Sequence, residues 1–207
     1  MIRLDKHAGL WTVTIDRPDK ANSLTGAMLG ELVGIARDAK DARALILTGQ
    51  GRVFSAGADL DEARAGLATS PLWEQLSGAI AALPCLTIAA LNGTLAGGAN
   101  GMALACDLRI SVPGAKVFYP VMKLGYLPQP SDPGRMAALI GPARTKLILM
   151  AGQKITAHEA YAFGLIDRIV APEDLMDTAR ALTVDSCAAP REIADGIAAL
   201  CGYKDLT

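Results

Sequence analysis

The amino-acid sequence predicts a single α/β domain with a mostly parallel sheet flanked by helices. Short apolar runs that end in a turn alternate along the chain with segments of helical periodicity, as strands and crossover helices do. The chain has 207 residues, of which 51% are apolar and 20% charged, enough for one substantial core. We expect one domain over residues 1–207, with its core over about 1–175 and C-terminal helices over about 176–207.

In the first half of the chain, strand and helix patterns follow one another closely. The stretch LWTVTI (Leu10–Ile15) alternates apolar and polar residues and is rich in β-branched side chains, which predicts a strand. Apolar residues then recur at helical spacing over residues 25–40, and the continuous apolar run 43–49 predicts a buried strand of a parallel sheet. Residues 71–83 have a helical pattern that Pro84 ends.

The second half repeats this alternation. The apolar run LTIAALNG (residues 86–93) ends in an Asn-Gly turn, and DLRISV (residues 107–112) predicts a further strand. The small residues 94–106 between them predict a helix that is entered through glycines. Shorter helices punctuated by Gly and Pro are expected over residues 131–141, 143–152, 156–166 and 190–203.

Charge and hydropathy argue against several classes of function. Lys and Arg together number 20 and Asp and Glu 21, and a net charge of −1 gives no support to nucleic-acid binding. The N-terminus lacks the continuous apolar core of a signal peptide, and no run of about 18 apolar residues occurs elsewhere. We therefore expect a cytoplasmic protein that binds neither nucleic acid nor membrane.

The cysteines and histidines do not form a recognisable metal or hydrolytic motif. The four cysteines are Cys85, Cys106, Cys187 and Cys201. They are scattered without a C-x-x-C pair, so we expect no metal site and interpret them as reduced, buried, small apolar side chains. His158 lies at an expected helix start and is interpreted as structural, while His7 is placed in a loop before the first strand. A Ser-His-Asp triad is therefore poorly supported.

Two glycine-rich turns carry the functional signal. One strand leads into LTGQGRVFSAGADL (residues 47–60) and the next into LNGTLAGGANG (residues 91–101), and each turn precedes an expected helix start. Helix starts present unpaired N–H groups, so two such turns could aim donors at one developing oxyanion, and small residues would leave room for it. Ordinary tight turns remain the alternative. A P-loop is excluded, because Ala99 stands where that motif requires Lys.

Five segments in this order resemble the crotonase superfamily, the enoyl-CoA hydratase/isomerase family. They are VTIDRPDKANSL (13–24), ALILTGQGRVFSAGADLDE (44–62), AALNGTLAGGANGMALACDLRIS (89–111), AKVFYPVMKLGYLP (115–128) and AHEAYAFGLIDRIV (157–170). The resemblance implies the ClpP/crotonase-like fold, with repeated β-β-α units and here a short C-terminal helical part. It also implies a homo-oligomer, a trimer or hexamer, since this fold usually assembles in threes.

By resemblance, the two turns form an oxyanion hole for the thioester carbonyl of an acyl-CoA, which passes through an enolate. The donors would be the backbone N–H groups of Ala58 and Gly98. Coenzyme A would be part of the substrate, and no permanently bound cofactor or metal is implied. Candidate contacts to the CoA moiety are Lys20, Ala21, Asn22, Ala56, Asp59 and Leu60.

The sequence departs from the family at the positions that transfer protons. Hydratases use two glutamates, and here those positions hold Gly101 and Val121. Dienoyl isomerases and dehalogenases place an aspartate at the position of Gln129. Losing one acid or base typically costs about a hundred- to ten-thousand-fold in rate, so ordinary hydration is not expected.

Other residues could supply the missing acid and base. The candidates are Asp132 and Arg135 in QPSDPGR, Asp61 and Glu62 after the first turn, and Tyr119 and Tyr126. Each can also be interpreted as a solvated or structural polar residue. Asp132 and Glu62 are the tentative acid/base pair of a lyase or isomerase in fatty acid metabolism. The alternatives are a CoA-thioester decarboxylase or hydrolase and a non-catalytic acyl-CoA-binding protein.

Family members continue beyond the end of this sequence with further helices that close the active site and join subunits. Here the sequence ends soon after AALCGYKDLT. We therefore expect a site that is more open, or one that a neighbouring subunit caps.

Overall fold

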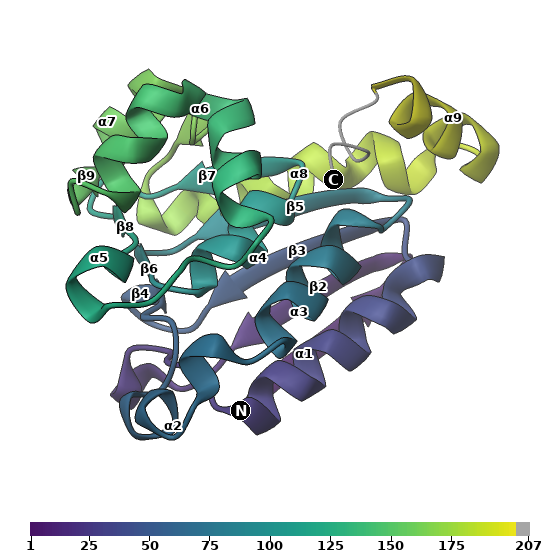
Figure 1. Ribbon diagram of the computed structural model, residues 1–207. Helices are drawn as coiled ribbons and strands as arrows, with labels where there is room; N and C mark the ends of the chain where they lie inside the picture. Colours follow the sequence, from purple (N-terminus) through teal and green to yellow (C-terminus); the bar gives the residue numbers. More distant parts are fainter. Residues whose placement is uncertain (202–207) are drawn as a thin grey trace.

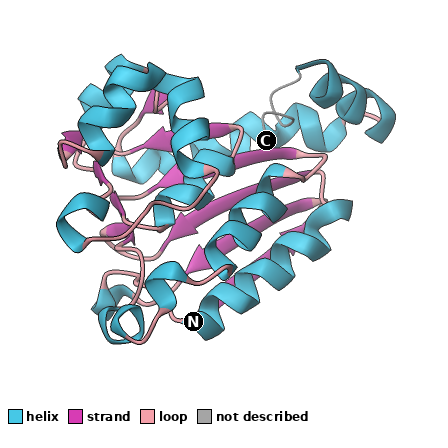
Figure 2. Ribbon diagram, in the orientation of Figure 1, coloured by secondary structure: helices cyan, strands magenta, loops and turns pink. Residues whose placement is uncertain are grey.

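The computed structural model describes residues 1–201, which form two sheets flanked by helices (Figure 1, Figure 2). The six strands of the large sheet are, in spatial order, β1 (Ile2–His7), β2 (Leu10–Ile15), β3 (Ala44–Gly49), β5 (Leu86–Leu91), β7 (Leu108–Ser111) and β10 (Arg168–Ile169). All neighbours in it pair in parallel except the β1–β2 hairpin. The expected mostly parallel sheet is confirmed.

A small sheet lies beside the large one and produces the repeated β-β-α unit. Its strands are, in spatial order, β4 (Val53–Ser55), β6 (Thr94–Ala96), β8 (Lys116–Phe118) and β9 (Ile155–Thr156). In each repeat the first strand (β3, β5 or β7) belongs to the large sheet and the next one along the chain (β4, β6 or β8) to the small sheet. This arrangement brings corresponding turns of successive repeats to neighbouring places.

Helices cover both faces of the large sheet. They are α1 (Gly26–Asp38), α2 (Leu60–Arg64), α3 (Leu72–Ala81), α4 (Ala99–Ala105), α5 (Val121–Leu124), α6 (Asp132–Leu149), α7 (Ala157–Phe163), α8 (Leu175–Ala188) and α9 (Arg191–Cys201). In Figure 1, α1 and α3 cross the front of the sheet, with α4 beside them, while α8 packs behind β3, β5 and β7. No helix within residues 1–201 is both long and apolar enough to span a membrane.

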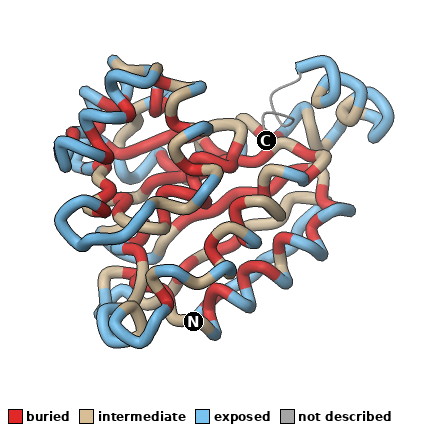
Figure 3. Tube along the Cα trace, viewed as in Figure 1, coloured by how far each residue is buried: buried red, intermediate tan, exposed pale blue. Residues whose placement is uncertain are grey.

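The central strands form the core, as their composition requires. Five of the six residues of β3 and five of the six of β5 are buried, because helices cover both faces of a parallel sheet. Figure 3 shows this buried layer as a red band across the middle of the molecule. The helix expected over residues 25–40 is α1, and the side chain of Thr25 accepts a hydrogen bond from the N–H of Met28 at its start.

Several sequence-based expectations are wrong in detail. His7 is not in a loop, because it ends β1 and pairs with Leu10 across the hairpin. The small residues after 93 first form β6, and the helix begins only at Ala99. The break expected between the helices over 131–141 and 143–152 is present, because α6 consists of two helices joined across a kink, where Gly141 adopts a non-helical conformation with φ of 78° before Pro142.

The C-terminal part is helical, as expected over about 176–207. Helix α8 lies in this region, and α9 agrees with the helix expected over 190–203 as far as Cys201, the rest lying outside the described residues. Cys85 and Cys106 are buried as expected, but Cys187 is half-buried and Cys201 is exposed. The expectation of four buried thiols is wrong for these two, since α9 has no buried residue and α8 packs only one side against the sheet.

Candidate active site

The two glycine turns predicted from the sequence lie against each other. They follow β4 and β6, which pair in parallel in the small sheet. Gly57 and Gly97 have φ values of 89° and 57°, a region that L side chains rarely adopt. A Cβ atom on Gly57 would lie 2.9 Å from the carbonyl oxygen of Ala96 and 3.4 Å from the backbone nitrogen of Gly98. Contact as close as this requires glycine for steric as well as conformational reasons.

In the first turn, one backbone N–H group is left without an acceptor. The N–H of Gly57 donates to the hydroxyl of Ser55 (3.2 Å), and that of Asp59 donates to the carbonyl of Leu24 (2.8 Å). Between them, the N–H of Ala58 has no hydrogen-bond acceptor within the described part of the chain. The fixed neighbours hold this single donor in place and leave it free for a ligand.

The second turn is arranged in the same way. The N–H of Gly97 donates to the carbonyl of Phe118 (3.2 Å). The side-chain amide of Asn100 donates to the carbonyls of Gly97 (2.8 Å) and Phe118 (3.0 Å). The N–H of Gly98, at the start of α4, has no acceptor among residues 1–201. A Cβ atom on Gly98 would lie 3.0 Å from the ring of Trp73, so a larger residue here would require the ring to shift by a few tenths of an ångström.

Both free donors belong to residues that line one cavity of about 210 Å³. The other lining residues are Ala56, Leu60, Ala63, Ala68, Trp73, Gly97, Tyr119, Pro120, Val121, Leu124, Tyr126, Leu127 and Gln129. None of these side chains carries a formal charge at neutral pH, and most are apolar. The cavity therefore combines an apolar wall with two residues whose backbone N–H groups have no acceptor among the residues described, a combination suited to an anion that develops on a carbonyl oxygen.

A buried carboxyl group lies behind the cavity wall. Asp132, the first residue of α6, is fully buried, and its Oδ2 accepts a hydrogen bond from the hydroxyl of Tyr119 at 2.9 Å. Its other oxygen, Oδ1, has no hydrogen-bond partner in the described structure. Burial raises the pKa of Asp132 from an ordinary 3.8 to about 7. Burial and the adjacent Asp132 also raise the pKa of Tyr119 well above its usual value.

Two charged residues near Asp132 change the pKa of its carboxyl group. Arg135, one turn along α6, lowers the pKa of Asp132, and Glu74 of α3 raises it, although burial outweighs both. Glu74 accepts hydrogen bonds from the backbone N–H (3.3 Å) and the hydroxyl of Ser131, and Arg135 donates to the hydroxyl of Ser77 (3.0 Å). Both residues are thus occupied in joining α6 to α3.

The structure does not bring the second expected acid/base residue to the cavity. The Oε2 atom of Glu62 accepts a hydrogen bond of 2.7 Å from the N–H of Gly26 at the start of α1, and Glu62 does not line the cavity. Asp61 is exposed and pairs with Arg64. Sequence spacing places both carboxyl groups just after the first turn, but the direction of α2 turns them away from the donors.

The structure also places the residues that the resemblance aligns with the family's proton-transfer groups. Val121, aligned in this way with the second hydratase glutamate, lines the cavity. Gly101 lies on α4, where a Cβ atom would be 2.8 Å from Oδ1 of Asp132. Gln129 also lines the cavity, and its side chain donates to the carbonyl of Ala68 (3.4 Å).

The candidate CoA-binding residues fall into two groups. Lys20 is exposed, and Leu60 is 73% exposed at the edge of the cavity. Asn22, by contrast, is buried and occupied: its side chain accepts from the N–H of Arg17 (2.9 Å) and donates to two backbone carbonyls at 2.9 and 2.6 Å. Its role is to fix the loop in a left-handed conformation, with φ of 53°.

The remaining three candidates act through the backbone or hold the loop. Ala21 adopts φ of 50°, and its carbonyl accepts from the N–H of Ala56 at 3.0 Å, which joins the loop to the first turn. The carboxylate of Asp59 forms an ion pair of 2.7 Å with Arg17. The hydrogen bond from Arg17 holds the pKa of Asp59 below its usual value. Arg17 and Trp73 have structural roles at the site that the sequence analysis missed, because nothing in their spacing distinguishes them from ordinary loop and core residues.

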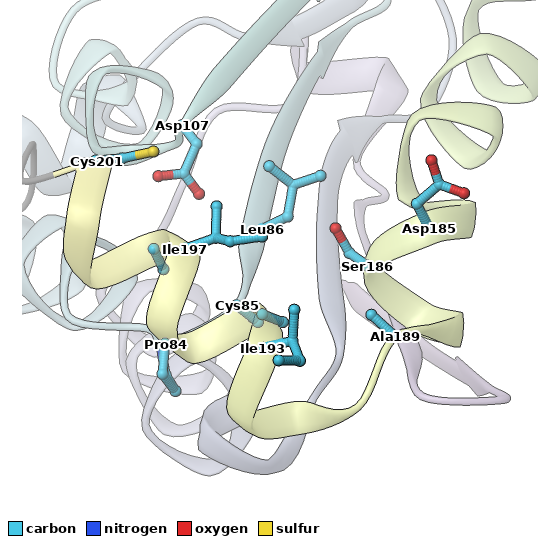
Figure 4. Close-up of a pocket in the computed structure, with 12 residues that line it drawn as sticks. Pro84, Cys85, Leu86, Asp107, Asp185, Ser186, Ala189, Ile193, Ile197 and Cys201 are labelled. Atoms are coloured by element: carbon cyan, nitrogen blue, oxygen red, sulfur yellow. The ribbon is translucent and has the colours of Figure 1, made fainter.

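A second cavity of about 320 Å³ lies between α9, the end of α8 and the chain before β5 (Figure 4). Ile193 and Ile197 of α9 line it opposite residues 84–86, and its wall is mainly apolar. No residue of either glycine turn lines it, and Figure 1 shows α9 at the opposite end of the molecule from the small sheet. Although this cavity is larger, the two free N–H groups do not open into it, so the candidate active site is the smaller one.

Comparison with known proteins agrees with this geometry. The sequence model of the family described as enoyl-CoA hydratase/isomerase matches residues 5–198. YngF of Bacillus subtilis is 37% identical over 187 residues, which are 86% of this chain and 72% of YngF. Carnitinyl-CoA dehydratase of Salmonella arizonae is 36% identical over 191 residues, 87% of this chain and 72% of that protein.

A solved structure gives the same result for the fold. The crystal structure of an enoyl-CoA hydratase from Bacillus anthracis matches with a TM-score of 0.90 and 29% identity, over 97% of this chain and 82% of that one. Together, the family match, the relatives and the shared architecture show that this chain has the crotonase fold and belongs to the enoyl-CoA hydratase/isomerase family.

Proposed function

We propose that the protein binds the thioester carbonyl of an acyl-CoA between the N–H groups of Ala58 and Gly98 and stabilises the enolate that forms from it. The observation that carries this proposal is the pair of donors without acceptors, which neighbouring hydrogen bonds hold at one apolar cavity. An oxyanion-hole donor acts most strongly where water is excluded and its direction is fixed beforehand. Family membership supplies the CoA thioester as the substrate class.

The surface around the cavity supports a CoA-bearing substrate. Lys20 and Leu60 are exposed, and they lie in the two segments that resemble the family's CoA-binding stretches. The carboxylate of Asp59 and the side chain of Asn22 are bound within the protein, so they would shape this surface rather than contact CoA. Coenzyme A enters as part of the substrate, and the proposal requires no resident cofactor.

Hydration by the usual two-glutamate mechanism does not fit the cavity. No carboxylate among residues 1–201 lines it, since Val121 and Gly101 replace the two glutamates and Glu62 is bound to α1. Addition of water needs one group to activate the water and another to protonate the adjacent carbon. We therefore propose an enolate-forming reaction that needs fewer proton-transfer groups, such as an isomerisation.

The oxyanion hole can be tested with a chromophoric thioester. Polarisation of the carbonyl of cinnamoyl-CoA should shift its absorbance to longer wavelength when it binds, whether or not turnover follows. The φ of Gly98 is −59°, which proline adopts, so Gly98→Pro can remove the N–H donor. Because any Cβ at this position would meet Trp73, the comparison is best made in a Trp73→Leu background.

Gly98→Ala in the same background is the matched control, because it adds a Cβ but keeps the N–H. We expect the spectral shift in the Ala variant and its loss in the Pro variant, with turnover lower by about 10²–10³-fold when a donor is removed. Circular dichroism would establish that both variants are folded. An equal shift in folded Gly98→Pro and Gly98→Ala would refute the oxyanion hole.

A further inference from the structure

One buried carboxyl oxygen has no explanation in the packing of the core. Asp132 is fully buried, forms no salt bridge within residues 1–201 and leaves Oδ1 without a hydrogen bond. An unpaired buried carboxyl oxygen is costly, and the great majority of buried polar atoms in proteins are satisfied. A catalytic role would explain why a carboxyl group stands at this position.

The space for this carboxyl group comes from Gly101. A Cβ on Gly101 would lie 2.8 Å from Oδ1 and 3.2 Å from Oδ2 of Asp132, closer than real side chains approach. A side chain at position 101 would therefore displace the carboxyl group of Asp132 from its present place. The start of α6 thus puts a carboxyl group close to the place that a side chain at 101 would fill.

Asp132 reaches the cavity through Tyr119. Tyr119 lines the cavity that Ala58 and Gly98 also line, whereas Asp132 does not. The Tyr119 hydroxyl donates to Asp132 Oδ2 at 2.9 Å, and the N–H of Gln129 approaches the same hydroxyl at 3.5 Å. A tyrosine in such a setting is a poor base alone, because burial opposes its ionisation. It can transfer a proton when a partner accepts or returns one at the same time.

We propose that Tyr119 and Asp132 form a proton relay, in which Tyr119 is the catalytic residue at the substrate carbon and Asp132 is the positioning residue that stores the proton. This inference rests on the proposed function, since it acts on the enolate that Ala58 and Gly98 stabilise. The inference assigns the proton transfer to the hydrogen-bonded side chains of Tyr119 and Asp132. Glu62 then has no part in the reaction.

The steps balance without a further reactant. The Tyr119 oxygen takes a proton from the carbon next to the thioester while its own proton passes to Asp132 Oδ2. The electron pair of the broken C–H bond becomes the enolate, whose oxygen the Ala58 and Gly98 N–H groups hold. In the return step the proton passes from Asp132 through Tyr119 to carbon, and the negative charge returns to Asp132.

This arrangement defines a reaction class and a substrate class. A single relay can remove a proton from one carbon and return it to another, which moves a double bond along the acyl chain. It offers no second group to activate water. Because no charged side chain lines the cavity, the acyl group would be apolar. The structure thus favours the conversion of a 3-enoyl-CoA with an apolar chain into the conjugated 2-enoyl-CoA.

The relay has a characteristic dependence on pH. Removal of the proton requires Asp132 as a carboxylate, and the groups that face it are Tyr119, Glu74 of α3 and Arg135 of α6. Burial dominates over these neighbours and places the pKa of Asp132 at about 7. The rate of isomerisation should therefore be lost as the pH falls through about 7. A residue with a merely structural role would not produce this dependence.

The test compares three variants of the whole chain: Tyr119→Phe, Asp132→Asn and, as the control outside the cavity, Glu62→Gln. The readouts are the appearance of conjugated-enone absorbance from 3-hexenoyl-CoA and deuterium uptake from D₂O. We expect losses of about 10²–10⁴-fold in the first two variants, the range for an acid/base group, and wild-type rates in Glu62→Gln. The pH dependence near 7 should disappear from any remaining activity of Asp132→Asn.

Two outcomes would overturn the relay. One is folded Tyr119→Phe or Asp132→Asn that retains nearly wild-type rates, and the other is rapid hydration of crotonyl-CoA by the purified wild type. Failure of the oxyanion hole looks different, because the cinnamoyl-CoA shift would then be absent from the wild type. If that shift persists in Tyr119→Phe and the rate does not fall, the relay alone is wrong.

Discussion

Replacing Asp132 by Asn should change how the stability of the protein depends on pH. The folded chain holds the pKa of Asp132 at about 7, whereas the unfolded chain returns it to about 3.8. Between these values the folded state binds a proton that the unfolded state has released, so the free energy of unfolding falls as the pH rises. Below 3.8 and above 7 the two states carry the same charge at this residue, and the dependence ends.

The size of the effect follows from the width of this window. Each pH unit within it changes the free energy of unfolding by about 1.4 kcal/mol, so the two units between pH 5 and 7 amount to about 3 kcal/mol. Asn cannot titrate, so Asp132→Asn removes this contribution. The stability of the wild type relative to Asp132→Asn should therefore fall by about 3 kcal/mol between pH 5 and 8.

Urea unfolding followed by circular dichroism at pH 5, 6, 7 and 8 measures this difference directly. The matched control is Glu62→Gln, which removes a carboxyl group that is not buried in the core. Its stability should run parallel to that of the wild type. Parallel curves for the wild type and Asp132→Asn would refute the reasoning, because they would mean that Asp132 ionises in the folded state as it does in water.

Two further substitutions test the geometry around the site. Gly101→Ala should destabilise the protein by about 1–3 kcal/mol, as overpacking does, and the loss should vanish in an Asp132→Ala background, a coupling that urea unfolding of the four variants measures. Asn22→Ala should lower the free energy of unfolding by about 2–4 kcal/mol, because it leaves buried backbone groups without hydrogen-bond partners and places alanine at a positive φ. Lys20→Ala in the same loop should leave the melting temperature unchanged, and an equal loss in both would contradict the structural role of Asn22.

Much of the fold follows from local patterns in the sequence. The sequence runs of β3 and β5 are continuously apolar because parallel strands covered by helices on both faces have no side exposed to solvent. The glycines at 57 and 97 mark turns whose backbone conformation other residues avoid. The short strands of the small sheet were less visible, since three residues carry little periodicity, whereas Gly141 and Pro142 correctly marked the kink that divides α6.

Part of the candidate site could likewise be predicted from the sequence, and part could not. Small residues in two matching turns indicated a possible oxyanion hole, the family resemblance assigned its donors to Ala58 and Gly98, and both residues line one cavity. The acid/base residues could not be chosen from spacing alone. Glu62 and Asp132 were equal candidates in the sequence, but the direction of α2 carries Glu62 to the start of α1, while the start of α6 buries Asp132 against Gly101 and Tyr119.

The sequence by itself therefore determined the fold class, the family resemblance and the two glycine turns, because each depends on contacts between residues close in the chain or on the conformation of single glycines. Only the tertiary structure decided which carboxyl group could serve the cavity. Gly101 lies on α4, Asp132 starts α6 and Tyr119 lies between β8 and α5, so their distances depend on how these parts of the chain pack together. Burial, which shifts the pKa of Asp132, is a property of that packing and has no signature in the neighbouring sequence.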